Sequence, residues 1–371
     1  MSKMNSSDDD DGSFDELMAL WNAQEPDSSE EEDGECGPFI LGADSLDDED
    51  DAPSRQPEPV IPPDAVEPAE FAGDGESGDE GIHILPANFK FPQVKTGTRT
   101  PDRFASVRRL EKPVHLHVPD FVESRIGLAL EACPHAADAV EAMAHAERDL
   151  MAWGTPGRMR PVLLVGPPGS GKSTVARHYH EALGYAVQKQ NVAGMSDALS
   201  LVGTHQTYGD SKPSIVTEAI AHSGMANVCM IMDEVEKAPR ESRNGTVQDA
   251  LLQFLDLTEA RAFRDVYLNT SVDVSHVRWV LTANDLGMVS APLRSRCTVV
   301  HVPAPTVEHV PALAWNIIRE IEVERNLQPG WFDLSGYEMT KLQEVFTGDM
   351  RMLRRCVEVV LREQVRHWAR A

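Results

Sequence analysis

Eight residues in the middle of the chain constrain its fold more than any other segment. Residues 166–173 read Gly-Pro-Pro-Gly-Ser-Gly-Lys-Ser and directly follow the apolar run 161–165. Glycine permits backbone angles that a β-carbon forbids, so successive N–H groups of such a loop can point inward at an anion. A loop of this kind between a buried strand and a helix is typical of proteins that bind a nucleoside triphosphate with Mg²⁺.

The segment after this loop has a helical pattern over residues 173–183 and ends at Gly184. The N-terminus of such a helix adds positive partial charge beneath bound phosphates. We expect Lys172 to reach the β- and γ-phosphates and the Ser173 hydroxyl to bind Mg²⁺. A chance glycine-rich turn is the alternative, and the flanking strand and helix patterns argue against it.

Two later apolar runs also end in polar side chains. Residues 228–232 lead to Asp233 and Glu234, and residues 277–281 lead to Asn284. In phosphoryl-transfer sites a first carboxylate holds Mg²⁺ and a second can polarise the attacking water. An amide at the neighbouring strand end can hydrogen-bond that water or the γ-phosphate. The alternatives are a pair of capping carboxylates and a turn asparagine.

The predicted nucleotide site therefore combines the loop with the ends of two further strands. Its ligands are ATP and Mg²⁺, and we expect Ser173 and Asp233 to bind the metal. The predicted nucleotide-binding residues are Gly166, Pro167, Pro168, Gly169, Ser170, Gly171, Lys172, Ser173, Thr174 and Asp233.

Acidic residues are concentrated near the N-terminus. Residues 1–82 contain 27 of the 60 acidic residues and two of the 34 basic ones, so they carry almost all of the net charge of −26. Such a composition cannot bury enough apolar surface to offset chain entropy, and it predicts a disordered tail. The tail would repel nucleic acid and anionic membranes, so we expect neither as a partner. Its simplest role is to keep the protein in solution.

One segment of this tail, residues 13–21, has a helical pattern. One face of that helix would carry four apolar side chains, those of Phe14, Leu17, Met18 and Trp21. An amphipathic helix in a disordered tail often docks in a groove of a partner. We therefore predict a partner-docking motif here.

The remaining chain divides into three blocks. Residues 83–150 form a connector that is partly helical, from about residue 121 to residue 151. Residues 151–303 alternate short apolar runs with helical patterns, which predicts a parallel sheet with crossover helices. Residues 304–371 are helical throughout in pattern. The predicted strands are 162–165, 186–190, 228–232, 277–281 and 299–302.

Cysteine spacing and hydropathy indicate the compartment. The five cysteines show no paired spacing, and no signal peptide is recognisable, which favours a reducing cytoplasm. No apolar run approaches the roughly 20 residues that a membrane span needs.

The ordered set of motifs resembles the AAA+ ATPases, and more closely the ATPase module of Lon proteases. The similarity extends from about Phe121 to the C-terminus. It is carried by five segments, namely 233–237 (Asp-Glu-Val-Glu-Lys), 250–256 (Ala-Leu-Leu-Gln-Phe-Leu-Asp), 262–268 (Ala-Phe-Arg-Asp-Val-Tyr-Leu), 291–296 (Ala-Pro-Leu-Arg-Ser-Arg) and 347–351 (Thr-Gly-Asp-Met-Arg).

This resemblance implies a fold and roles for individual residues. The fold is α/β: a P-loop AAA+ module with a five-stranded parallel sheet flanked by helices, followed by a small all-helical lid. Glu234 and Asn284 (sensor 1) would act in catalysis. Arg296 would be the arginine finger inserted into a neighbouring subunit, and Arg351 would be sensor 2. A finger supplied in trans needs head-to-tail subunits, and in this family they most often form a hexameric ring.

Two departures from the Lon pattern limit the comparison. Lon proteases continue into a protease domain with a Ser–Lys dyad, and no residues remain after Ala371 for one, so we do not expect proteolysis by this chain alone. Tyr208 matches the aromatic position of the substrate-gripping pore loop, but the aliphatic position after it is Gly209. Tyr208 is therefore either a pore residue or part of a structural turn.

Three functions are compatible with these observations. The leading hypothesis is ATP hydrolysis coupled, in a chaperone-like ring, to remodelling or unfolding of a protein client. A clamp-loader-like or DNA-handling ATPase is the second, favoured by the Ser-Arg-Cys sequence at 295–297 but not by any basic stripe with interleaved aromatic residues. The third is a nucleotide-dependent scaffold with little turnover, which the intact Asp233, Glu234, Asn284 and Arg296 argue against.

Overall fold

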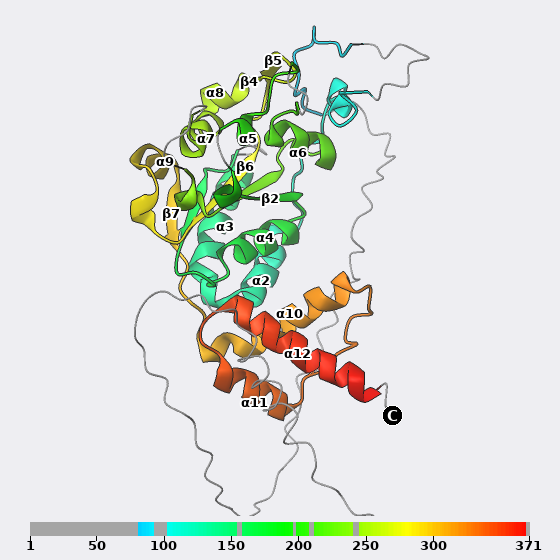
Figure 1. The fold of residues 1–371 in the computed structure, drawn as a ribbon, viewed down its shortest axis with the longest axis vertical. Coiled ribbons are helices and arrows are strands. Elements are labelled where there is room, and N and C mark those ends of the chain that lie inside the picture. Colours follow the sequence, from blue (N-terminus) through cyan, green and yellow to red (C-terminus); the bar gives the residue numbers. More distant parts are fainter. Residues whose placement is uncertain are drawn as a thin grey trace, which may run out of the picture. The chain divides into compact units, whose positions relative to one another are not determined.

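A parallel β-sheet buried on both faces forms the centre of the fold (Figure 1). The computed structural model describes residues 81–92, 102–153, 158–195, 198–207, 211–239 and 245–368. The strand order is β2-β3-β6-β1-β7, and every neighbouring pair is parallel. These strands are β1 (Val162–Val165), β2 (Val187–Asn191), β3 (Cys229–Asp233), β6 (Arg278–Ala283) and β7 (Thr298–His301).

Successive residues of each strand point to opposite faces, so the sheet divides the apolar interior into two cores. In β1, Leu163 and Val165 belong to one core, whereas Val162 and Leu164 belong to the other. The first core is covered mainly by α6 (Ile215–Ser223) and α7 (Val247–Leu255). The second is covered by α2 (Val122–Ala132), α3 (Ala137–Ala152) and α4 (Lys172–Ala182). Helices on both faces explain why the inner strands β1 and β3 are almost continuously apolar, whereas the edge strand β2 is mostly polar.

The predicted α/β fold class is confirmed, and each predicted strand overlaps an observed strand with ends that differ by no more than two residues. A second sheet, the antiparallel pair β4 (Phe263–Asp265) and β5 (Thr270–Val272), was not predicted, because strands this short leave no clear alternation. Residues 1–80 of the predicted tail, which include the motif 13–21, and Tyr208 lie outside the described residues. Ile82, the last residue assigned to the disordered tail, is instead part of the folded chain, because it forms a β-bridge with Val114.

The connector that we predicted for residues 83–150 packs onto both cores. Val107 and Leu110 lie in the first core, and the α3 side chains of Val140 and Met143 lie in the second. Ile82 and Val114 pair through a β-bridge, and Ile82 packs against the first core.

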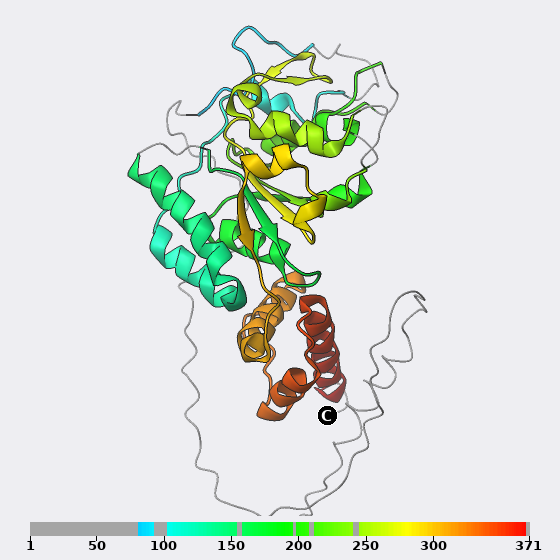
Figure 2. The same ribbon diagram turned by 90° about the vertical axis from the view of Figure 1, so that its left-hand side faces the viewer.

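Three helices follow the sheet, namely α10 (Val310–Glu324), α11 (Gly336–Val345) and α12 (Met350–Trp368). They form an orange-to-red group beside α2 and α4 in both views (Figure 2). Ser335 and Glu338 form a capping box that starts α11. In α12, Leu353, Val357 and Leu361 recur at helical spacing and are buried. We refer to these three helices as the lid.

The shorter helical segments connect these elements. None of the helices in the described ranges is both long and apolar enough to span a bilayer. The short segments are α5 (Leu199–Val202), α8 (Leu257–Arg261), α9 (Ala291–Arg296) and the 3₁₀ turns η1 (Arg108–Glu111), η2 (Pro134–Ala136), η3 (Val192–Gly194), η4 (Val235–Lys237), η5 (Leu286–Met288) and η6 (Val307–His309).

Candidate nucleotide site

The glycine-rich loop joins the end of β1 to the start of α4. Gly169 and Gly171 have φ angles of 76° and 82°, in the left-handed region that glycine adopts without strain. Gly171 is also the residue that precedes the first turn of α4. A β-carbon on Gly169 would lie 2.4 Å from Cγ of Asp349 at the start of the lid helix α12. Glycine at 169 is therefore required both by the backbone angle and by the approach of the lid.

Lys172 is held against this loop by neutral oxygen acceptors. Its Nζ donates to the carbonyls of Gly166 and Pro167, each at 2.9 Å, and to Asn284 Oδ1 at 2.8 Å. These three acceptors satisfy the ammonium without cancelling its charge, so the group still attracts anions. Burial lowers the pKa of Lys172, and nearby Glu236 partly opposes that effect.

Asp233, at the end of β3, gathers three donors around its carboxylate. Oδ1 accepts hydrogen bonds from Ser173 Oγ, at 2.8 Å, and from the Thr282 hydroxyl. Lys189 Nζ of β2 lies 2.7 Å from Oδ2. Burial alone would raise the pKa of Asp233, but the hydrogen bonds from Lys189 and Thr282 prevail and lower it. Asp233 is therefore charged at neutral pH.

The side-chain oxygens of Ser173 and Asp233 lie 2.8 Å apart and suit Mg²⁺, which prefers hard oxygen ligands. They also lie at the N-terminal end of α4, next to the loop that would hold phosphates. In the described part of the chain, no group of three or more histidine, cysteine or acidic side chains is arranged to hold a metal ion. The geometry therefore fits a metal ion that would take some ligands from Ser173 and Asp233 and others from bound phosphates.

Glu234 and Asn284 lie at neighbouring strand ends and are each held by a specific contact. Glu234 has a φ of 56°, which is unusual for a residue with a β-carbon and is common at functional sites. Its Oε1 lies 2.8 Å from Lys237 Nζ, and its backbone N–H donates to Thr282 Oγ1 at 3.1 Å. The Asn284 N–H donates to Oε1 of the buried Glu236 at 3.0 Å, which fixes the end of β6.

One pocket of about 210 Å³ brings most of the predicted site residues together. Its wall includes Gly169, Gly171, Lys172, Ser173, Thr174, Asp233, Glu234, Asn284 and Arg351.

The other predicted residues lie outside this wall. Gly166, Pro167, Pro168 and Ser170 belong to the loop behind it, where the Ser170 carbonyl accepts a hydrogen bond from His135 Nε2 at 2.9 Å. Arg296 lies on α9, is partly exposed, and donates to the Pro292 carbonyl at 3.3 Å. It does not line the pocket of its own chain.

Several pocket residues were not predicted from the sequence. Thr282 precedes Asn284 by two residues, and the two-residue period of a strand places both on one face, so the sequence does contain a signal for it. Lys189 lies in the mostly polar strand β2, where a charged residue gives no signal for a site. No sequence signal indicates the remaining histidine, asparagine and charged members, which come from α4, the η2 turn and the lid, namely His135, Arg177, His178, Asn316, Glu320 and Arg354.

Known proteins resemble the segment that builds this site. Residues 162–303 match the "ATPase family associated with various cellular activities (AAA)". The chain is 37% identical over 141 residues to the peroxisomal Lon protease homolog 2 of Pichia angusta, a region that covers 38% of the chain and 15% of that protein. It is 32% identical over 203 residues to the Lon protease of Helicobacter pylori (strain J99), covering 54% and 24% respectively.

A third relative is the Lon protease of Desulfovibrio desulfuricans, which is 31% identical over 213 residues, covering 56% of the chain and 24% of that protein. The chain thus matches less than a quarter of the length of each of these relatives.

Proposed function

Because residues 162–303 form an AAA domain and about half of the chain is homologous to the ATPase region of Lon proteases, we propose that this protein hydrolyses ATP to ADP and phosphate. An AAA domain implies nucleotide binding in general, usually with Mg²⁺. One observation supports the specific reaction most strongly. Lys172, Ser173, Asp233, Glu234 and Asn284, from α4 and the ends of β3 and β6, line one pocket beside the glycine-rich loop.

The proposed roles follow from the contacts of each side chain. The loop N–H groups and the Lys172 ammonium bind the β- and γ-phosphates. Ser173 and Asp233 would hold Mg²⁺, which neutralises phosphate charge when bound. Glu234 orients a water molecule and accepts its proton as the water oxygen bonds to the γ-phosphorus and the bond to the β-phosphate oxygen breaks. Asn284, fixed by Glu236 and hydrogen-bonded to Lys172, orients the γ-phosphate or that water.

We further propose that the active form is a ring, most simply a hexamer. Arg296 lies outside its own pocket, which supports a role in the site of an adjacent subunit. Head-to-tail contacts of this kind close into rings when the rotation permits. In such a ring Tyr208 would face a central pore and grip a protein client, and the motif 13–21 would recruit a partner. We also propose that the protein is located in the cytoplasm.

A steady-state ATPase assay with Mg²⁺ tests the proposed reaction. The wild-type protein should release phosphate, and Glu234→Gln should reduce turnover by about 10²-fold or more while ATP still binds, because only the proton acceptor is lost. Glu259→Gln, on the exposed helix α8, is a matched control that should leave turnover unchanged. Absence of wild-type turnover, or equal rates for the wild type and Glu234→Gln, would refute the proposal.

A further inference from the structure

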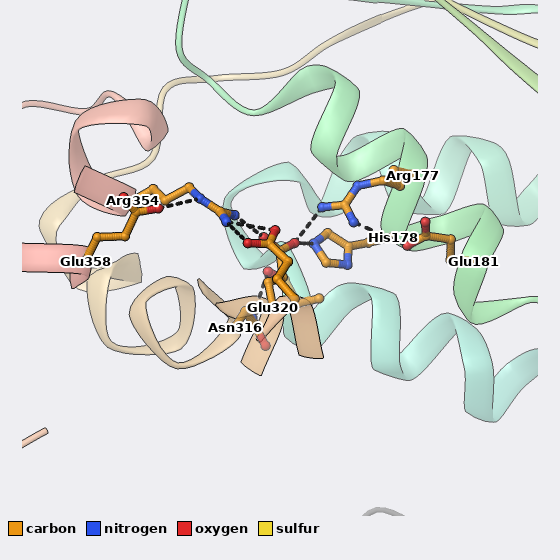
Figure 3. A network of polar contacts seen from close by, with 9 residues as sticks. Arg177, His178, Glu181, Asn316, Glu320, Arg354 and Glu358 are labelled. Atoms are coloured by element: carbon orange, nitrogen blue, oxygen red, sulfur yellow. Dashed lines mark hydrogen bonds and ion pairs between the residues drawn. The ribbon is translucent and has the colours of Figure 1, made fainter. Parts of the chain in front are cut away.

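A single carboxylate in the pocket wall joins three helices (Figure 3). Glu320 of α10 accepts a hydrogen bond from Arg177 Nη2 at 2.6 Å and lies 2.9 Å from His178 Nε2, both from α4. Its second oxygen accepts from Arg354 Nη1 of α12 at 2.8 Å. Glu320 therefore connects the helix that begins at the phosphate loop with two helices of the lid.

The charge of Glu320 is strongly favoured in this position. Its side chain is only 16% exposed. Burial would raise the pKa of Glu320, but His178 and Arg177 together lower it to about 2. Arg354 is fixed from its other side by Glu324 at 2.7 Å and by Glu358 at 3.1 Å. The guanidinium of Arg354 is thus held toward Glu320 by the lid itself.

This contact lies close to the phosphate loop. Arg177 follows Lys172 by five residues, which corresponds to a rise of about 7.5 Å along α4. Neutral hydrogen bonds also join the lid to the rest of the site. Met350 N–H donates to the Gly169 carbonyl at 2.9 Å, and Asn316 Nδ2 donates to the Ala132 carbonyl at 3.0 Å. Glu320 adds a charged contact to these.

Arg351 lies one helical turn before Arg354 on α12 and lines the same pocket. Lys172 lines this pocket as well, so the structure brings two cations to the wall that would face bound phosphates. The position of α12 therefore determines how closely the Arg351 guanidinium can approach bound phosphates.

We propose that Glu320 is a positioning residue that docks the lid on α4 and so holds Arg351 over the γ-phosphate of bound ATP. This inference rests on the ATPase function proposed above. Removing the carboxylate would break the charged contact between the lid and α4. Arg177 would keep its pair with Glu181 on α4, and Arg354 its pairs with Glu324 and Glu358 in the lid, so none of these pairs would join the two parts. A lid turned away from α4 would then be less disfavoured, and Arg351 would move with it.

Binding of ATP and ADP to Glu320→Gln tests this role. Both nucleotides would be titrated with Mg²⁺ by calorimetry, in a Glu234→Gln background so that ATP is not consumed. We expect the affinity for ATP to fall about tenfold, within the usual range of coupling between sites, and the affinity for ADP to fall much less. Glu363→Gln breaks another Glu–Arg pair of α12, outside the pocket, and should change neither affinity.

A double variant separates positioning from a general loss of stability. If Glu320 acts through Arg351, adding Arg351→Ala to Glu320→Gln should weaken ATP binding only slightly more. Should Glu320→Gln fail to fold, Arg354→Gln breaks the lid side of the same contact and should give the same ATP-selective loss.

Equal losses of ATP and ADP affinity, or additive effects of the two substitutions, would overturn the positioning role while leaving the ATPase proposal intact. A wild-type protein that binds neither nucleotide would overturn both.

Discussion

Arg278 and Glu147 form an ion pair that is almost completely removed from water, with side chains that are 1% and 2% exposed. Arg278 begins β6, and Glu147 lies on α3. Arg278 Nη1 also donates to Tyr185 Oη at 3.0 Å, and that hydroxyl donates to Glu147 Oε1 at 2.8 Å. Arg278→Met would leave the Glu147 carboxylate buried without its cation. Removing one partner of a buried pair typically destabilises a protein by about 3–5 kcal/mol.

Urea-induced unfolding, followed by far-ultraviolet circular dichroism, measures this loss as a decrease in the free energy of unfolding. Arg148→Gln is the matched control, because Arg148 is next to Glu147 in sequence but pairs with Glu123 at the surface, where the side chains are 40% and 70% exposed. An exposed pair contributes about 0–1 kcal/mol. The double variant Glu147→Leu with Arg278→Met should recover most of the loss, because no buried charge remains.

A loss for Arg278→Met no larger than that for Arg148→Gln would contradict a buried, unpaired Glu147. A double variant, Glu147→Leu with Arg278→Met, that is less stable than Arg278→Met alone would contradict it as well. The first result would mean that water or another cation reaches Glu147, and the second that shape rather than charge dominates at this position.

Three further predictions concern metal binding, pH and assembly. Lys189→Met removes the ammonium 2.7 Å from Asp233 Oδ2, so half-maximal ATPase activity should need about threefold less Mg²⁺; an unchanged Mg²⁺ titration would contradict this. Burial lowers the pKa of His180 to about 3, so between pH 6.5 and 3 only the unfolded chain binds its proton and stability falls as pH falls. The unfolding free energy of His180→Gln should therefore decline by about 2 kcal/mol less than that of the wild type between pH 7 and 5, and equal declines would contradict this. Arg296→Ala should lower ATPase turnover by about 10³-fold without weakening ATP binding, and wild-type turnover would exclude a finger in trans.

The parallel sheet could be predicted because its inner strands, β1, β3 and β6, are buried on both faces. Such strands appear in the sequence as short apolar runs, and each run ends where the next helix pattern begins. The loop was recognisable because both glycines with positive φ, Gly169 and Gly171, leave an explicit sequence pattern. These features depend on residues that are close together along the chain.

The lid side of the pocket could not be predicted, because its residues are far apart along the chain. Arg177 and Glu320 are 143 positions apart, and each lies on a helix where a charged residue normally faces water. Arg278 poses a related difficulty, because an arginine at the start of an apolar strand usually marks the strand boundary. Only the three-dimensional structure shows that Arg278 is buried against α3.

Calorimetric titration of Mg²⁺ and ATP into the wild-type protein and into Lys172→Ala addresses the phosphate loop most directly. The wild type should bind ATP at one site per chain. Lys172→Ala should bind it about a hundredfold more weakly, because a charged hydrogen-bond donor to the phosphates is lost. Circular dichroism should show that both proteins are equally folded. Superimposable binding curves for two folded proteins, or no heat from the wild type, would contradict the assignment of this pocket.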